Sequence, residues 1–155
     1  MNVGFGNLSA HKAGGWKAQS SRVRRWHERF VNSCRGSSSS PEERLDFFLA
    51  FCHNCYALRD WLQNDDVISK GRLDMLMQNT QSLRVCRDIA NGSKHLKINM
   101  PSVDPDFSIG REYCGSQIPE RWFVLAGNDL IDALSLSDEC LNAWQAFLQE
   151  HNLSM

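Results

Sequence analysis

The stretch PEERLDFFLAFCHNCYALRDWLQ, residues 41–63, is the longest and most apolar run of the chain. Ser40 before it is a favoured N-cap residue, and Pro41 suits the first position of a helix. Acids in the first turn strengthen this start signal. Because large apolar side chains then fall on almost every side, the pattern predicts a helix at the centre of a bundle.

The second informative segment is LRVCRDIANGSKHLKI, residues 83–98. At about 100° per residue, one stripe of a helix here holds five polar groups: Arg84, Arg87, Asp88, Asn91 and His95. If the stripe faces a cleft, these groups suit a phosphate, and if it faces inward, they form a polar packing network. Asn91-Gly92 is also a helix-stop signal, after which Lys94 and His95 would lie over the helix end.

The central helix offers partners for this stripe. Its polar exceptions are His53, Arg59 and Asp60, of which His53 and Asp60 are two turns apart and share a face. We expect Asp60 to be buried and to face Arg87 or His95. Such a contact is a structural ion pair in most proteins and an orienting carboxylate in some enzymes.

The remaining segments complete one predicted domain, residues 1–155. We expect an irregular N-terminal arm, a basic amphipathic helix, core helices, a short β excursion and a C-terminal helix capped by Asn128 or Asp129. These segments are residues 1–15, 16–35, 41–96, 97–126 and 128–150. The fold class is therefore mainly α, a bundle of four to five helices with a small β hairpin or short sheet inserted before the C-terminal helix.

Composition narrows the class of protein. The chain lacks an apolar run of 18 residues and a secretory signal pattern, so we expect a soluble, cytoplasmic protein with no membrane partner. The six cysteines lie in apolar or helical contexts, which favours reduced, buried thiols. Cys52 and Cys55 form a C-x-x-C pair in the middle of a helix, whereas redox pairs sit at a helix N-terminus. We expect no metal and no cofactor.

Charge is distributed unevenly along the chain. Residues 1–36 sum to +6 and residues 98–155 to −7, although the whole chain is at −1. The basic end can serve an anionic partner such as RNA, or the two ends can lie against each other. The candidate nucleic-acid contacts on the basic helix are Arg22, Arg24, Arg25 and Arg29.

A family resemblance rests on several of these segments together. YALRDWL at the end of the central helix, CRDIANGSKHL, a short β excursion and a C-terminal helix resemble small bacterial proteins related to the HEPN superfamily of helical nucleotide-binding and RNase domains. The motif of that superfamily is an arginine, commonly a polar residue next, and a histidine four to six residues on. Arg87-Asp88 and His95 resemble it, although seven residues separate them and Asn91 stands where a histidine is expected.

The resemblance implies a metal-independent ribonuclease or an RNA-binding protein, in a homodimer, of a toxin or defence system with a possible cognate partner protein. His95 would act as general acid or base, since its ordinary pKa suits proton transfer at neutral pH. Arg87, with Arg84 or Lys94, would hold the phosphate, while Asp88 and Asn91 would orient these groups. The alternative is a non-catalytic helical interaction or structural module whose polar stripe is a buried packing network.

Overall fold

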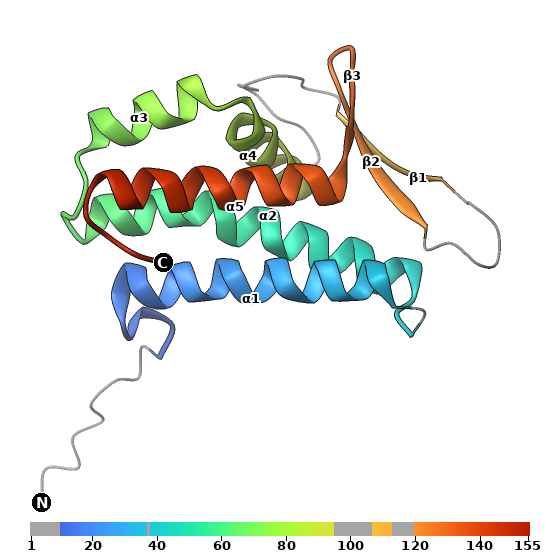
Figure 1. Cartoon of the computed structure of the whole chain (residues 1–155), viewed down its shortest axis with the longest axis horizontal. Coiled ribbons are helices and arrows are strands. Elements are labelled where there is room, and N and C mark those ends of the chain that lie inside the picture. The colour runs from blue at the N-terminus through green and yellow to red at the C-terminus, as the bar shows by residue number, and fades with distance from the viewer. Residues whose placement is uncertain (1–9, 37, 95–106, 113–119) are drawn as a thin grey trace, which may run out of the picture.

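The protein is mainly helical, with five α-helices and a small antiparallel sheet before the last of them (Figure 1). This computed structural model describes residues 10–36, 38–94, 107–112 and 120–155, and of Lys94 the backbone alone. A short 3-10 helix, Ala10–Lys12, precedes the first α-helix. The elements are α1 Gly15–Arg35, α2 Pro41–Asn64, α3 Lys70–Asn79, α4 Gln81–Lys94, β1 Ser108–Glu112, β2 Arg121–Ala126, β3 Asp129–Asp132 and α5 Ala133–Glu150.

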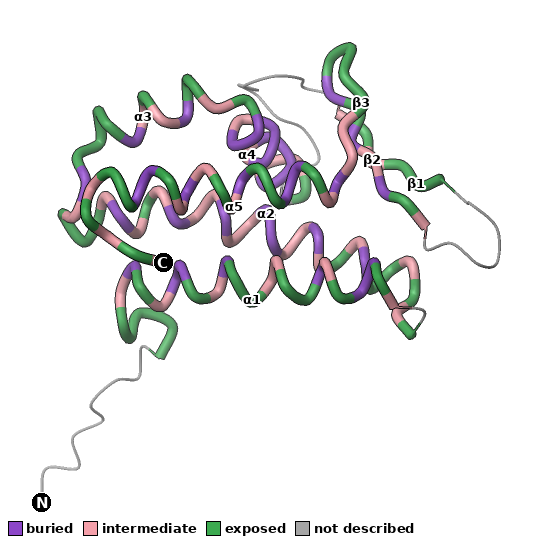
Figure 2. Tube along the Cα trace, in the orientation of Figure 1, coloured by how far each residue is buried: buried purple, intermediate pink, exposed green. Residues whose placement is uncertain are grey.

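Helix α2 lies at the centre of the bundle, as predicted, and contacts every other α-helix. Its start is a complete capping box, because the Ser40 hydroxyl accepts from the Glu43 backbone N–H and the Glu43 carboxylate accepts from the Ser40 backbone N–H. Most positions of α2 are buried or half-buried, whereas α1 and α3 alternate buried with exposed ones (Figure 2). Apolar side chains all round this helix therefore meet neighbours on several sides.

Helix α1 packs along α2 through one apolar face, which confirms the predicted amphipathic helix. Val23 and Phe30 are fully buried, and the Phe30 ring lies 5.1 Å from that of Phe48 on α2. At its N-terminus, the backbone N–H of Trp16 donates to the Asp65 carboxylate at 2.7 Å. Asp65, the residue after α2, thus accepts from a backbone N–H that has no partner within α1. This bond ties the start of α1 to the end of α2.

The sheet has the order β1-β2-β3, with both neighbouring pairs antiparallel. A small hairpin or short sheet in this region was predicted and is confirmed, but the prediction that residues 128–150 form one helix is wrong. Ala126 pairs with Asp129, so Gly127 and Asn128 form a two-residue turn, and Gly127 adopts a positive φ of 62° that suits such a hairpin. The helix begins only at Ala133, where Asp132, and not Asn128 or Asp129, accepts from the Ser135 backbone N–H.

The inner face of β2 closes one end of the core. Trp122, Val124 and Ala126 alternate inward and are buried, while the residues between them are half-buried or exposed. Strand β2 lies against α5, whose Trp144 is fully buried. Cys34, Cys52, Cys55, Cys86 and Cys140 are free and buried, as expected, whereas Cys114 lies outside the described residues. No described helix is both long enough and apolar enough to cross a membrane.

Candidate anion-binding pocket

A pocket of about 220 Å³ opens where α2, α3 and α4 meet. It is lined by Tyr56 and Arg59 of α2, by Asp74, Met77 and Gln78 of α3, and by Arg84 and Arg87 of α4. Tyr56 and Arg59 share a face of α2 because they are three residues apart, and the same spacing places Arg84 and Arg87 together on α4. Two of the three helices, α2 and α4, therefore contribute three arginines to the lining of one hollow.

The predicted stripe of α4 is divided between surface and core. Arg84, Arg87 and Asn91 are half-buried, whereas Asp88 is only 1% exposed and lies at the edge that faces the core. The helix runs through Asn91 and Gly92 to Lys94, so the stop signal at Gly92 is not used. The stripe thus stays helical up to the residue before His95. His95 and the side chain of Lys94 lie outside the described residues.

Asp74 balances part of the positive charge in the pocket. Its carboxylate pairs with the Arg59 guanidinium and, at 2.6 Å, with the Lys70 ammonium one turn earlier on α3. The hydrogen bonds from Lys70 and Arg59 lower the pKa of Asp74. Burial by itself would lower the pKa of Arg59, but the hydrogen bond and charge of Asp74 outweigh it and raise that pKa. Arg59 is therefore held in place as a permanent cation.

Arg84 and Arg87 have no such counterion among the described residues. Within the described part of the chain, neither side chain makes an ion pair, and the Nε atom of each is buried without a hydrogen-bond partner. A buried N–H group without an acceptor costs roughly 1–3 kcal/mol, and more when it is charged. The lining residues carry three arginines against Asp74, an excess of two positive charges. An anion with several oxygens would balance this charge and accept hydrogen bonds from guanidinium groups.

The predicted contacts from α2 to this stripe are largely wrong. The Asp60 side chain is 57% exposed and pairs with its neighbour Arg59 at 3.3 Å, because it falls on the solvent side of α2. It is neither buried nor paired with Arg87, and the other expected partner, His95, lies outside the described residues. His53 does reach α4, where its Nε2 lies 2.8 Å from the Ser93 hydroxyl. The α4 residue that His53 contacts is therefore Ser93, which the sequence analysis did not single out.

The four arginines predicted on α1 differ in their surroundings. Arg22 is engaged locally, donating to Gln19 and to the His11 carbonyl and stacking 5.7 Å from the Trp61 ring. Arg24 donates to the Met155 carbonyl at 3.1 Å. Arg29 lies over the Trp26 ring. Arg25 is exposed and makes no ion pair with any described residue, so it is the most available of the four.

The sequence analysis noted Arg59 only as a polar exception of α2, and it did not single out Tyr56, Asp74, Met77 or Gln78 of the pocket. One local signal was present, since Lys70 and Asp74 have the spacing of a helical ion pair. The meeting of α3 with α2 and α4 is a tertiary contact that no periodicity in the sequence reports. Sequence periodicity found Arg84 and Arg87 because both lie on one helix.

The pocket can hold an anion by charge and by several hydrogen bonds at once. Guanidinium groups match the geometry of phosphate and carboxylate oxygens, and Tyr56 adds an aromatic ring beside them. No metal ligand set of His, Asp or Glu is found in this pocket among the residues described. Comparison of the chain with family models, with curated proteins and with solved structures gives no match.

Proposed function

We propose that this protein binds RNA and that the pocket of Arg59, Arg84 and Arg87 holds a phosphate of the RNA backbone. The observation that carries the proposal is the pair Arg84 and Arg87, two half-buried guanidinium groups without an acceptor among the described residues. Phosphate supplies charge and several acceptor oxygens in a geometry that guanidinium groups match.

The size and lining of the pocket favour one unit of a polymer over a whole cofactor. Pockets that enclose drug-sized ligands usually measure about 300–1,000 Å³, and this one is about 220 Å³. Tyr56, half-buried at its wall, offers a ring on which an unstacked base can lie. Stacking on aromatic rings together with phosphate contacts is the usual way in which single-stranded RNA is bound.

The resemblance to the HEPN superfamily extends the proposal to cleavage. The ribose 2′-hydroxyl would attack the adjacent phosphate, with His95 moving the proton and Arg87, with Arg84 or Lys94, stabilising the developing charge. Asn91 and the buried Asp88 would orient these groups. His95 directly follows α4, the helix that carries Arg87. A homodimer would bring two such pockets to one RNA, as expected of a toxin or defence nuclease.

Binding is tested with a labelled single-stranded RNA by fluorescence anisotropy. Arg84→Ala and Arg87→Ala are each expected to weaken binding about tenfold or more, since a hydrogen bond to a charged group contributes about 1.5–3 kcal/mol. Each substitution is also expected to reduce by about one the slope of the logarithm of the RNA association constant against the logarithm of the salt concentration. Arg111→Ala is the matched control, because Arg111 is an exposed arginine of β1 paired only at the surface. Equal affinity of all four proteins would refute the proposal.

Cleavage is tested separately with the same RNA. The wild type is expected to cleave it without added metal, and Arg87→Ala and His95→Ala are expected to lose that activity. Equal activity or equal inactivity of the three proteins would contradict the nuclease while leaving the binding result to stand by itself. The RNA target is then sought by sequencing the products.

The burial of Asp88 favours a second candidate, a non-catalytic helical module in which the stripe serves packing. In that case Arg87→Ala should unfold the protein, because breaking a buried pair costs roughly 3–5 kcal/mol. Since Arg87 is half-buried and unpaired among the described residues, RNA binding instead predicts a melting temperature within a few degrees of the wild type. A thermal melt of Arg87→Ala separates the two candidates.

A further inference from the structure

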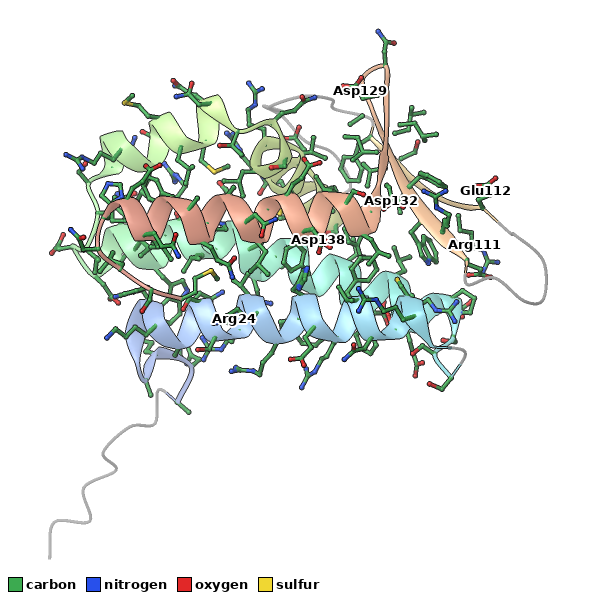
Figure 3. The ribbon with its side chains drawn as sticks, viewed as in Figure 1. Arg24, Arg111, Glu112, Asp129, Asp132 and Asp138 are labelled. Atoms are coloured by element: carbon green, nitrogen blue, oxygen red, sulfur yellow. The ribbon has the colours of Figure 1, made fainter. Side chains whose placement is uncertain are left out.

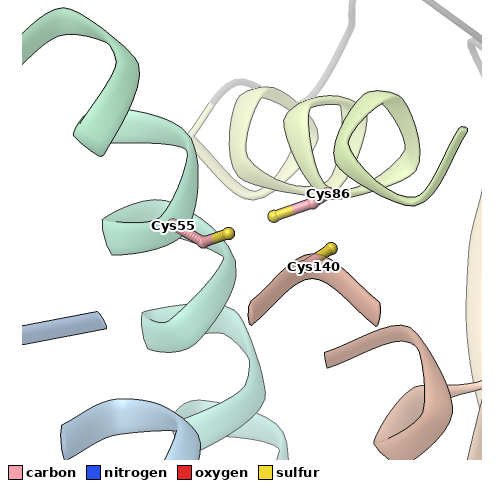
Figure 4. Close-up of side chains that lie close together, drawn as sticks. All are labelled: Cys55, Cys86 and Cys140. Carbon is pink, nitrogen blue, oxygen red and sulfur yellow. The ribbon is translucent and has the colours of Figure 1, made fainter. Parts of the chain in front are cut away.

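Three cysteine sulfurs converge in the core, away from the arginine pocket. Cys55 of α2, Cys86 of α4 and Cys140 of α5 direct their Sγ atoms toward the space between the three helices (Figure 4). These sulfurs all lie within 4.8 Å of one another, and each residue is at most 1% exposed. Cysteines far apart in the sequence thus meet at the junction of three helices.

With neutral thiols at this place, one buried hydrogen-bond donor of the core is left without an acceptor among the described residues. Cys86 and Cys140 donate to the carbonyls of Cys52 and Ser82, at 3.4 and 3.3 Å. The indole Nε1 of Trp144, by contrast, is buried without a well-formed hydrogen bond to any described residue. A neutral thiol is a weak acceptor, whereas a thiolate is a strong one. A buried donor beside these sulfurs therefore fits a site in which a sulfur carries charge.

We propose that Cys55, Cys86 and Cys140 hold a thiophilic metal ion of the Zn²⁺ class. With Zn–S bonds of about 2.3 Å, the sulfurs of a tetrahedral site lie about 3.8 Å apart, so sulfurs already within 4.8 Å need only small side-chain shifts. Soft thiolates select Zn²⁺ or Cu⁺ over Mg²⁺ and Ca²⁺. Cys52, fully buried one turn before Cys55 and outside this group of three, is the residue we assign to the fourth position.

The position of the cluster assigns the ion a structural role. A closed site with no open face ties α2, α4 and α5 together at the centre of the core, where burial excludes substrate. Because thiols must lose their protons to bind, metal uptake releases protons to the solvent. The site also explains why the C-x-x-C pair occurs in the middle of a helix, since its partners are supplied by two other helices.

The test is a titration of the full, reduced, chelator-treated protein with Co²⁺ and then with Zn²⁺. The wild type is expected to take up one equivalent of Co²⁺ with a near-ultraviolet thiolate-to-cobalt absorption, which Zn²⁺ removes, and to release protons as it does so. Cys55→Ser, Cys86→Ser and Cys140→Ser should each weaken Co²⁺ binding at least about tenfold. Cys34→Ser is the matched control, because Cys34 is a buried cysteine of α1 outside the cluster.

Each result decides the proposal. Loss of the absorption in the three cluster variants, with Cys34→Ser unchanged, supports the site. Absence of the absorption in folded wild-type protein overturns it, whether or not the variants fold. An affinity for Co²⁺ equal to that of the wild type in any of the three folded cluster variants also overturns the proposal, because the ion would then be bound by other thiols.

Discussion

Asp74 is the residue that limits the positive charge of the arginine pocket. It is the one carboxylate among the described lining residues, and it already pairs with Arg59 and Lys70. Asp74→Asn removes that charge without changing the size of the side chain, so RNA should bind about threefold more tightly or better at low salt. Anisotropy titrations measure the change. The control is Asp60→Asn, since Asp60 also contacts Arg59 but does not line the pocket, and an equal gain there would refute the argument.

The same residue makes stability depend on pH in the acid range. The pKa of Asp74 is lowered by Lys70 and Arg59, so the folded state binds fewer protons than the unfolded state. This contribution is complete above the unfolded pKa of about 3.9 and is lost as the pH falls through the lowered folded pKa. Urea unfolding at a series of acid pH values should therefore show a steeper loss of stability in the wild type than in Asp74→Asn. Parallel curves would contradict this assignment.

For single residues, prediction from sequence succeeded where the residues concerned lie on the same helix. The spacing of Arg84 and Arg87 placed both on one side of α4, and they do line a common pocket. The prediction failed for Asp60. Its side chain was expected to be buried against α4, but its position on α2 lies at the edge that faces solvent. Which side of a nearly all-apolar helix is exposed depends on how its neighbours pack, and the sequence pattern of that helix does not contain this.

At the scale of elements, the start of α2 depends on the Ser40 capping box. The Ser40 hydroxyl accepts from the Glu43 N–H at 3.1 Å, and the Glu43 carboxylate accepts from the Ser40 N–H at 3.0 Å. Ser40→Ala should lower the free energy of unfolding by about 1 kcal/mol, since N2 or N3 donors are left to the solvent. Urea denaturation measures the loss. Ser39→Ala is the control, because the half-buried Ser39 makes no side-chain hydrogen bond with any described residue. An equal loss in both variants would show that the cap does not matter.

The helices were predictable from periodicity and start signals, whereas β3 was not. Residues 129–132 read as the first turn of a helix, because Asn128 and Asp129 are good caps and Leu130 and Ile131 fit a helical face. The observed hairpin arises because Gly127 takes the left-handed conformation at φ 62° and β2 offers a free edge to pair with. A local pattern thus allowed both structures, and the long-range pairing with β2 selected the strand.

At the scale of the whole molecule, the basic and acidic ends of the chain do lie against each other in part. His27 of α1 pairs with Asp138 of α5 at 2.7 Å, and Arg24 of α1 reaches the Met155 carbonyl at the C-terminus. Figure 3 shows Arg24 on α1 and Asp138 on the neighbouring α5. Arg25 and Arg29 remain exposed. Contact between the two ends therefore involves His27 and Arg24 of α1 and leaves Arg25 and Arg29 facing solvent.

That exposed basic surface and the arginine pocket lie on opposite sides of α2. Helix α1 covers the face of α2 that carries Asn54 and Trp61, through Gln19 and Arg22. Tyr56 and Arg59 are rotated roughly 140–200° from that face, and α3 and α4 lie across the bundle from α1 (Figure 1). A short RNA in the pocket can therefore not reach Arg25 at the same time.

This geometry makes the size of the RNA a test of how it is bound. For an RNA of about four nucleotides, the lower end of common binding-site sizes, Arg25→Ala should change the affinity less than about twofold, whereas Arg87→Ala should weaken it about tenfold. A longer RNA that extends around the molecule should become sensitive to Arg25→Ala as well, because further phosphates then meet the basic face of α1. Comparable losses from both substitutions with the four-nucleotide RNA would place the binding surface on α1 and remove the pocket from the interface.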